Sequence, residues 1–484
     1  MNYKMMGRLH ALILAIEAVF MLPALLISLI DGTDKVTFAF LVSIGIIAAV
    51  CALLSLLCRG ARRDFYAEEG LICVGSSWMS LSFFGCLPFF FSREIPNFID
   101  ALFEMVSGFT TTGASIVANV EGLSRAILYW RSFSHWLGGM GVLVFLLAIL
   151  PVSGKNEGFT MHILRAESPG PDVGKFVPKM RQTAAVLYLS YIALTVLNFV
   201  FLVIGEMPVF DAVCTAFGTA GTGGFGIKND SMASYSPYIQ NVCTVFMLLF
   251  GVNFSIYYLI LLRRIRSVFK DEELRLYVGI VIASIALIVW NISPLYESLG
   301  EGIRHAAFQV SSIITTTGFA TTDFDLWPSF SKSILTLLMI VGACAGSTGG
   351  GFKCARVLLI FKTLKRNMAQ ISHPQRVKAI RMNEKTVDEK IVANTNAYLA
   401  VYVIIIAIST IIISLDGFGF TTNFSAVLAC FNNIGPGFEA VGPTMNFGSY
   451  GILSKIVLII DMLAGRLEIF PILILFNKRA WKRG

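Results

Sequence analysis

The sequence predicts an all-α polytopic membrane protein, with four parallel repeats around one central pore and an added N-terminal helix pair. Three observations predict this fold. The 484 residues are 56% hydrophobic and only 14% charged, with a mean hydropathy of +0.73, far above that of a soluble globular domain. Apolar runs long enough to cross a bilayer recur along the whole chain. A glycine-bearing polar segment follows a short apolar segment four times.

The apolar runs predict about ten spanning helices, because each run is close to the ~20 residues that cross a bilayer as a helix. They lie at residues 10–31, 36–58, 70–92, 126–151, 183–204, 239–262, 275–293, 333–361, 396–415 and 451–476. The first run follows Lys4 and Arg8 but is too long for the apolar core of a signal peptide. We therefore expect it to be retained as a helix.

Lysine and arginine are concentrated in alternate connecting segments. If the N-terminus is cytoplasmic, the inside segments hold 29 of the 38 basic residues. The positive-inside rule then predicts a multi-pass protein with both termini in the cytoplasm. The net charge of +8 is divided among membrane-flanking segments, which does not favour a nucleic-acid partner.

Each predicted repeat contains a spanning helix, a short helix that enters from outside, a polar run with glycine, and a second spanning helix. The short helices and polar runs are DALFEMVSGFTTTGA (Asp100 to Ala114), DAVCTAFGTAGTGGF (Asp211 to Phe225), RHAAFQVSSIITTTGF (Arg304 to Phe319) and SAVLACFNNIGPGF (Ser425 to Phe438). We align them on Gly113, Gly223, Gly318 and Gly437. The chain then divides into an extra helix pair at 1–60 and repeats at 61–155, 176–268, 272–365 (with a broken second helix) and 392–484.

Two spans and one re-entrant segment return the chain to the side on which it began. The repeats therefore run in the same sense, unlike the inverted repeats that are common in carriers. Four such units around one axis would enclose a central path.

The polar runs are the candidate ion-binding site. Non-helical backbone at membrane depth must face protein or a water-filled path, because an unpaired amide in hydrocarbon costs several kcal/mol. Carbonyl and threonine oxygens from four runs would suit a singly charged cation. The predicted residues are Thr111, Thr112, Gly113, Gly221, Thr222, Gly223, Thr316, Thr317, Gly318, Gly435, Pro436 and Gly437. The alternative is that these glycines serve helix packing or ordinary re-entrant loops; four copies in register favour the ion path.

The second helix of the third repeat is predicted to be interrupted at GACAGSTGGGFK (Gly342 to Lys353), because so many glycines cannot make a stable helix. The candidate gate residues are Gly346, Ser347, Thr348, Gly349, Gly350 and Gly351. Close helix packing is one alternative. A nucleotide-binding loop is another, but Ser347 stands where such a loop has lysine and no strand precedes it.

Arg466 lies inside the last apolar run, close to Asp461 and Glu468. A charged group at this depth usually has an ionic partner or faces an aqueous cavity. Two hypotheses follow. Arg466 either forms a buried ion pair with Asp461 or Glu468, or it projects into the path beneath the polar runs and raises a barrier to cations.

Other polar residues have a structural and a functional interpretation. His135 and Trp136 fit interhelix contacts better than a proton relay, because the neighbouring glycines allow close helix approach. Glu104, Asp100 and Asp211 lie at or near the N-termini of the short helices, where the helix dipole stabilises them; attracting cations to the mouth is a second role.

The chain resembles the superfamily of potassium transporters that includes the bacterial Trk and Ktr membrane subunits and their plant and fungal relatives. It is most similar to the TrkH type in SHWLGGMG (Ser134 to Gly141), GSTGGG (Gly346 to Gly351) and AGRLEIF (Ala464 to Phe470), and in the extra helix pair. The resemblance implies four potassium-channel-like units, each with a filter glycine, and potassium as the permeant ion. K⁺ would then bind at Thr111, Thr112, Thr222, Thr316 and Thr317. It also implies a mobile gate loop and a location in the bacterial cytoplasmic membrane.

The resemblance further implies a homodimer in membrane lipid and a cytosolic nucleotide-binding ring of the TrkA type. We expect no cofactor in this chain, and a nucleotide (NAD or ATP/ADP) only on that partner. The basic stretches Arg263 to Arg275, Lys353 to Lys390 and the tail WKRG would dock such a partner, or serve only as solvated inside loops.

Two classes of function remain open. One is a gated ion-conducting subunit; the other is a proton- or sodium-coupled symporter working by alternating access. Parallel repeats and uncharged polar runs favour the first class, since a carrier would more often show mid-membrane carboxylates and inverted repeats. An enzyme is not indicated, because no nucleophile, base and orienting group recur together.

Overall fold

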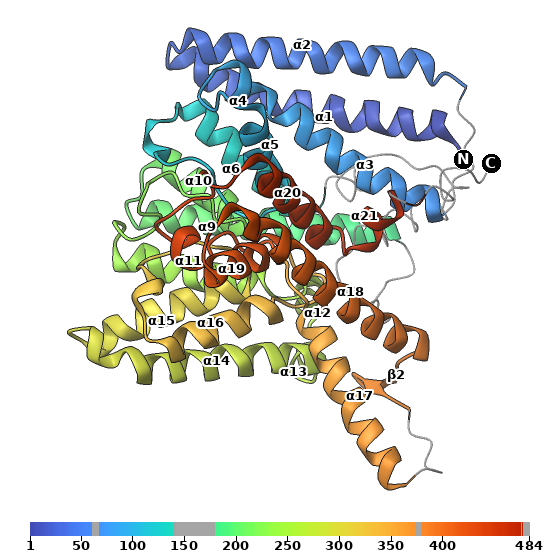
Figure 1. Cartoon of the computed structure of the whole chain (residues 1–484), viewed down its shortest axis with the longest axis vertical. Helices are drawn as coiled ribbons and strands as arrows, with labels where there is room; N and C mark the ends of the chain where they lie inside the picture. The colour runs from blue at the N-terminus through green and yellow to red at the C-terminus, as the bar shows by residue number, and fades with distance from the viewer. Residues whose placement is uncertain (61–66, 140, 142–179, 374–378, 476, 478–484) are drawn as a thin grey trace.

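The computed structural model describes residues 1–60, 67–139, 141, 180–373, 379–475 and 477. Most of the basic inside segment expected at Lys155 to Arg181 lies outside the described residues, as do residues 478–484 at the tail and some of the predicted repeat boundaries. The chain begins with α1 (Tyr3–Ile30) and α2 (Asp34–Leu57). These two helices pack against each other along one edge of the molecule (Figure 1). They form the predicted extra pair.

The rest of the described chain repeats one order of elements: a long first helix, a short re-entrant helix that we call the pore helix, and a second helix, which is interrupted in the second, third and fourth repeats. The first helices are α3 (Ala67–Gly85) continued by α4 (Leu87–Phe91), α9 (Met180–Ile204), α14 (Glu272–Ile292) and α18 (Glu389–Ile413). The pore helices are α5 (Phe98–Phe109), α10 (Val209–Gly221), α15 (Leu299–Ile314) and α19 (Phe420–Phe431). The second helices begin with α6 (Arg125–Gly139), α11 (Pro237–Phe250), α16 (Ser329–Val341) and α20 (Ile452–Arg466).

Local sequence explains where several of these helices begin. Asn97 and Ser298 cap α5 and α15, because each side chain accepts a hydrogen bond from a backbone N–H in the first turn. Asp100 and Asp211 lie in the first turns of α5 and α10, where the helix dipole favours a negative charge.

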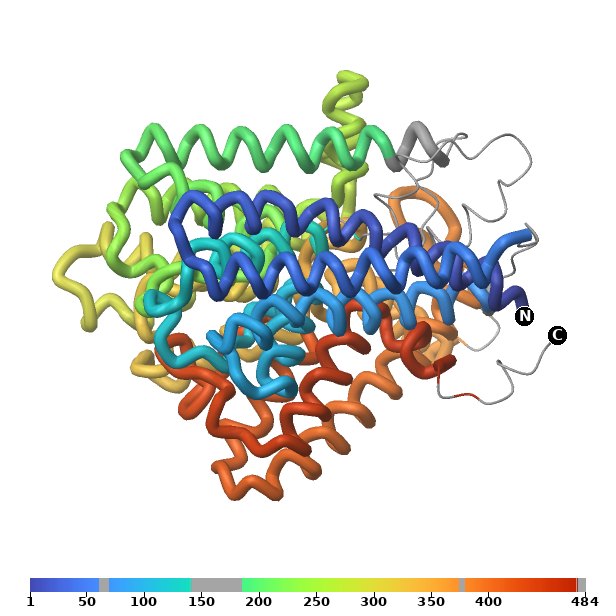
Figure 2. The backbone as a smooth tube through the Cα atoms, turned by 90° about the horizontal axis from the view of Figure 1, so that it is seen from above, coloured from blue at the N-terminus to red at the C-terminus, as the bar shows by residue number. Residues whose placement is uncertain are grey.

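The four repeats close into a ring. Each pore helix packs against its own second helix and also against the second helix of the preceding repeat: α10 against α6, α15 against α11, α19 against α16, and α5 against α20. The last contact joins the fourth repeat to the first. Figure 2 places α9 and α18 on opposite edges of this assembly.

The second helices differ from the prediction, because the break is not confined to the third repeat. In the second repeat, α11 and α12 (Phe254–Leu261) meet at an angle of 89°. In the fourth, α20 and α21 (Phe470–Leu475) are separated by a short turn in which Glu468 and Ile469 have positive φ. In the third, the predicted break divides α16 from α17 (Cys354–Ser372), which projects away from the helical body (Figure 1). In the first repeat, α6 ends at Gly139.

These breaks change the count of spanning helices. Among the described residues, six helical segments are long and apolar enough to cross a membrane, or seven if the bent pair α11–α12 counts as one span. Of the ten expected spans, 239–262, 333–361 and 451–476 are each divided in two, and 126–151 lies partly outside the described residues. Gly251 lies between α11 and α12, and Gly465 is the last residue but one of α20.

The remaining elements are short. They are α13 (Ile265–Phe269), the 3₁₀ turns η1 (Val120–Gly122), η2 (Ser293–Leu295), η3 (Phe324–Leu326), η4 (Ser414–Asp416) and η5 (Glu439–Val441), and the strands β1 (Arg381–Met382) and β2 (Lys385–Thr386). The two strands pair as a small antiparallel hairpin.

Candidate functional site

Each pore helix ends in a turn of the same backbone shape. We call these turns polar turns 1 to 4, at residues 110–114, 221–225, 315–319 and 432–436. In each turn a non-glycine residue with a left-handed conformation precedes, by two positions, a glycine of positive φ. These pairs are Thr111 (φ 56°) and Gly113 (φ 80°), Thr222 (54°) and Gly224 (72°), Thr316 (59°) and Gly318 (86°), and Asn433 (56°) and Gly435 (100°).

The hydrogen bonds confirm that the four turns share one register. In each turn the N–H of the residue before the glycine donates to a carbonyl in the last turn of the pore helix: Thr112 to Ser107 (2.9 Å), Gly223 to Gly218 (2.9 Å), Thr317 to Ser312 (2.8 Å) and Ile434 to Ala429 (2.8 Å). This bond is typical of a helix that ends on a left-handed residue. The four positions are therefore equivalent.

This register corrects the sequence alignment in two repeats. The equivalents of Gly113 and Gly318 are Gly224 and Gly435, whereas the alignment had used Gly223 and Gly437. Relative to the triplets 111–113 and 316–318, the predicted triplet 221–223 is displaced by one residue and the predicted triplet 435–437 by two. The equivalent triplets are 222–224 and 433–435. Two glycines are candidates in each repeat, Gly223 and Gly224 in the second and Gly435 and Gly437 in the fourth, and spacing alone could not decide which one adopts positive φ.

The four left-handed glycines form a closed ring of contacts between repeats. A Cβ added to Gly113, Gly224 or Gly318 would overlap the carbonyl oxygen of Gly223, Thr317 or Ile434, respectively. A Cβ at Gly435 would lie 2.8 Å from the carbonyl oxygen of Thr112, which returns the ring to its first turn. Glycine is required because the backbones touch and because φ is positive.

A side-chain bond adds to this ring between the fourth and first repeats. Asn433 Nδ2 donates to Thr112 Oγ1 at 2.9 Å. Within turns 1 and 3 the hydroxyls of Thr110 and Thr112 (2.7 Å) and of Thr315 and Thr317 (2.8 Å) also pair. Asn433 could not be identified from the sequence, because an alignment on Gly437 places it outside the predicted triplet 435–437.

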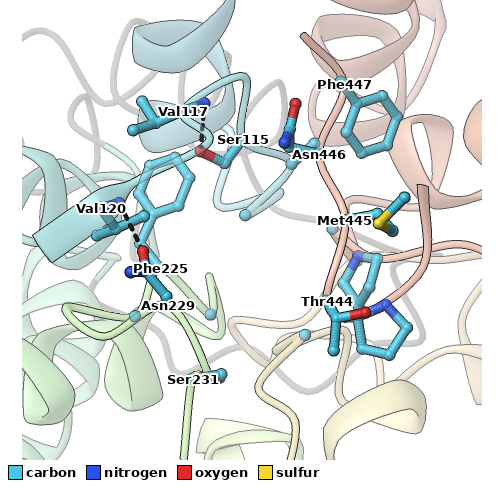
Figure 3. Close-up of a pocket in the computed structure, with 18 of the residues that line it drawn as sticks. Ser115, Val117, Val120, Phe225, Asn229, Ser231, Thr444, Met445, Asn446 and Phe447 are labelled. Atoms are coloured by element: carbon cyan, nitrogen blue, oxygen red, sulfur yellow. Dashed lines mark hydrogen bonds between the residues drawn. The ribbon is translucent and has the colours of Figure 1, made fainter. Parts of the chain in front are cut away.

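A cavity of ≈ 110 Å³ lies at the mouth of the ring. Its wall includes all four left-handed glycines and the residues that follow turns 1 and 2. Figure 3 shows Val120 and Phe225 on one side, with Thr444 and Met445 on the other. Among the described residues of this wall, Arg131 and Lys228 are charged and none is a carboxylate.

The three acids expected near the mouth are engaged elsewhere. Glu104 is fully buried and pairs with Arg131, so it is not an exposed mouth carboxylate. Asp100 accepts from Lys455 at 2.6 Å, and Asp211 accepts from the hydroxyl of Tyr235 at 2.9 Å. The helix-dipole interpretation fits Asp100 and Asp211, whereas Glu104 lies beyond the first turn of α5.

The glycine-rich segment 342–353 lies against the opposite side of the turns. The N–H of Gly350 donates to Thr316 Oγ1 at 2.6 Å. A Cβ on Gly350 would overlap the carbonyl oxygen of Asn432, and one on Gly349 would lie 2.8 Å from that of Thr315. We call this segment the intramembrane loop. It closely contacts the ends of pore helices α15 and α19.

Arg466 joins the intramembrane loop to the first repeat. Its Nη1 donates to the carbonyl of Thr348 at 2.7 Å, and its Nη2 donates to those of Gly138 (2.6 Å) and Gly139 (2.7 Å). The two acids of the ion-pair hypothesis are not the acceptors of these three hydrogen bonds. Glu468 pairs with Arg356, and Asp461 accepts from Ser409 at 2.9 Å.

His135 is an interhelix contact, as the sequence predicted. Its Nδ1 lies 2.9 Å from the carbonyl of Gly108, and the N–H of Phe225 points to its Nε2 at 3.3 Å. Both contacts are satisfied by the neutral ring with its proton on Nδ1. Trp136 Nε1 donates to Thr195 Oγ1 at 3.3 Å. Within SHWLGGMG, Met140 lies outside the described residues.

Comparison with known proteins gives consistent results. A family model described as TrkH, cation transport protein, matches residues 37–482. The Trk system potassium uptake proteins TrkH of Escherichia coli (strain K12) and of Halomonas elongata are 34% and 35% identical over 492 and 493 residues, covering 100% of each chain. The crystal structure of the potassium transporter TrkH from Vibrio parahaemolyticus matches with a TM-score of 0.87 and 31% identity, again over 100% of both chains.

Proposed function

This chain belongs to the TrkH family of cation transport proteins, and on that premise we propose that it transports potassium ions across the membrane along the axis of its ring. Relatives that match the full length of the chain are named potassium uptake proteins. Transport of an ion is not an enzymatic reaction.

The observation that carries the proposal is the closed ring of four left-handed glycines. The ring brings four carbonyl-bearing turns to one axis, with the cavity at one end and the intramembrane loop at the other. Backbone carbonyls in a narrow path can replace the hydration shell of K⁺ without a carboxylate. The four turns contain no charged residue, which suits a singly charged ion better than a divalent one.

The proposed ion-binding residues follow the structural register. They are Thr111, Thr112 and Gly113 in turn 1, Thr222, Gly223 and Gly224 in turn 2, Thr316, Thr317 and Gly318 in turn 3, and Asn433, Ile434 and Gly435 in turn 4. The earlier candidates Gly221, Pro436 and Gly437 flank these triplets. K⁺ is the transported substrate, and the chain itself needs no cofactor for this role.

The intramembrane loop is the proposed gate. It contacts the pore-helix ends through Gly349 and Gly350, and Arg466 ties Thr348 to the end of α6. Opening then requires that the loop leave these contacts. The positive charge of Arg466 would also oppose a cation that passes close to it.

The proposed assembly is a homodimer in the bacterial cytoplasmic membrane, with both termini in the cytoplasm. A cytosolic nucleotide-binding ring of the TrkA type would regulate the gate. The relatives are described as parts of a Trk system, and the projecting helix α17 with the basic residues around it offers a surface on the proposed cytoplasmic side.

Reversal potentials of the purified protein in liposomes test the proposal. With opposing K⁺ and Na⁺ gradients, we expect potentials close to the K⁺ equilibrium value. Potentials that follow neither cation would overturn the proposed pathway. A reversal potential that moves with the pH gradient would instead support the proton-coupled symporter, and one that needs both K⁺ and Na⁺ would support the sodium-coupled one.

A further inference from the structure

A buried ion pair contacts the segments that follow polar turns 1 and 2. Arg131 on α6 is 3% exposed, and Glu104 on α5 is 0% exposed. Arg131 Nε donates to Glu104 Oε1 at 2.5 Å. Burying two charges is costly, and such a pair adds little to stability compared with apolar packing. Its position therefore suggests a role in shaping what surrounds it.

Arg131 reaches both turns at once. Its Nη2 donates to the hydroxyl of Ser115, just after turn 1, at 3.1 Å. Its Nη1 donates to the carbonyl of Gly226, just after turn 2, at 2.9 Å. The guanidinium carbon also lies 3.7 Å from the centroid of the Phe225 ring, in turn 2 itself. One side chain thus binds the residues that follow two neighbouring turns.

Glu104 binds the segment that follows turn 1 through both of its carboxylate oxygens. Its Oε1 accepts from the hydroxyl of Ser115 at 3.0 Å, and its Oε2 accepts from the N–H of Ile116 at 2.9 Å. The carboxylate therefore ties the chain that leaves turn 1 to the pore helix that enters it. Hydrogen bonds to a charged group are stronger than neutral ones.

This arrangement occurs at only one of the four junctions in the described structure. The residues at the position of Glu104 in the other three pore helices are Thr215, Gln309 and Ala426, none of which is acidic. The junction between turns 1 and 2 is therefore the one with this buried Arg–Glu pair, whereas the fourth and first repeats are joined by the Asn433–Thr112 hydrogen bond and the Lys455–Asp100 ion pair.

We propose that Arg131 and Glu104 are positioning residues that set the spacing between polar turns 1 and 2, and thereby the discrimination of the ring between K⁺ and Na⁺. This inference rests on the proposed function of the ring. Arginine is required because its planar fork meets three acceptors and an aromatic face together, whereas a lysine ammonium is a single point of charge on a flexible stem.

The test uses Arg131→Lys, with Ser115→Ala as a milder variant that removes the hydroxyl shared by both charged groups. The matched control is Arg125→Lys, on the same helix and also ion-paired, to Asp31 at 3.1 Å, but 57% exposed, whereas Arg131 is buried. Reversal potentials in K⁺/Na⁺ gradients give the permeability ratio for each purified full-length protein. Thermal unfolding in detergent measures folding.

We expect Arg131→Lys to lower the K⁺/Na⁺ permeability ratio about fivefold, the factor equivalent to ~1 kcal/mol, and Ser115→Ala to lower it by a smaller factor. Arg125→Lys should match the unmodified protein. A role in folding alone would reduce the yield and the total flux but leave the ratio unchanged. An unchanged ratio in folded Arg131→Lys overturns the inference. If Arg131→Lys does not fold, an unchanged permeability ratio in Ser115→Ala overturns the inference.

The unmodified protein separates this inference from the proposed function. If it shows no preference for K⁺, the proposed function fails. If it prefers K⁺ and the variants keep that preference, only the positioning role of the ion pair fails.

Discussion

The carbonyl oxygen of Thr317 occupies the position that the Cβ of any larger residue at Gly224 would take. The two residues belong to different repeats, so this backbone contact positions polar turn 2 against polar turn 3 without any side chain. Because the same relationship holds around the ring, the close approach of four backbones is the central structural feature of the proposed pathway.

Gly113→Ser should weaken discrimination against Na⁺. Gly113 has a φ of +80°, and a Cβ there would overlap the carbonyl oxygen of Gly223. Turns 1 and 2 must then separate, which widens the path on one side. We expect a fall of about fivefold or more in the K⁺/Na⁺ permeability ratio, equivalent to ~1 kcal/mol, measured by reversal potential. Gly279→Ser is the matched control, because nothing lies within 4 Å of its added Cβ. Retained selectivity in Gly113→Ser would contradict the proposed filter.

The register of turn 4 can be tested by comparing Gly435→Ala with Gly437→Ala. Gly435 has a φ of +100° and faces the carbonyl oxygen of Thr112, whereas an added Cβ on Gly437 would meet Ser425 Oγ and Val441 Cγ2. Reversal potentials should show a lower K⁺/Na⁺ ratio for Gly435→Ala and an unchanged ratio for Gly437→Ala. The opposite result would restore the alignment based on Gly437.

Arg466→Ala should raise ion flux in the absence of any regulatory partner. The substitution removes three hydrogen bonds from a charged donor, to the carbonyls of Thr348, Gly138 and Gly139. Since such bonds contribute about 1.5–3 kcal/mol each, the intramembrane loop should leave its closed position more often. Rubidium uptake into liposomes is expected to increase about tenfold, equivalent to ~1.4 kcal/mol. Lys365→Ala, at an exposed position on α17, serves as the control. Equal uptake by both variants would exclude Arg466 from the gate.

Glu17→Met should stabilise the protein. Glu17 on α1 is 2% exposed, and neither carboxylate oxygen has a hydrogen-bond partner in the described structure. Its Oε1 lies beside Gly85, near Met105 and Phe109 at the end of the first pore helix. Removing an unpartnered polar group from such a site should gain about 1–3 kcal/mol. The unfolding temperature in detergent should rise by several degrees, while Glu297→Met, at an exposed position, should not change it. A lower unfolding temperature for Glu17→Met would show that the carboxyl is needed there.

The sequence predicted the parts of this structure that depend on composition and repetition. Apolar length revealed the first helices, and the polar runs revealed four pore helices that end in glycine-bearing turns. The break at Gly342 was predicted because several glycines stand together. A single glycine at position 251 or 465 gave no comparable signal, since one glycine costs a helix only about 1 kcal/mol.

The details of the candidate site depended on contacts between distant segments. Gly223 and Gly224 are adjacent in sequence, and only the approach of Thr317 distinguishes them. The sequence predicts Glu104 near the mouth, whereas its partner, Arg131, comes from another helix and holds it buried. Arg466 had two nearby acids in sequence, but its hydrogen bonds reach carbonyls of the first and third repeats instead.

The four unlike turns belong to a single polypeptide, and this has a consequence for how the pathway can change. In a channel assembled from four identical subunits, every substitution is applied four times and alters all quadrants together. Here a mutation in one codon alters one quadrant and leaves the other three as they were. Thr111, Thr222 and Thr316 stand at three of the equivalent positions, whereas Asn433 stands at the fourth. In the proposed pathway a single substitution changes one of the four polar turns. Selectivity can therefore be changed through one turn at a time, during evolution or by design.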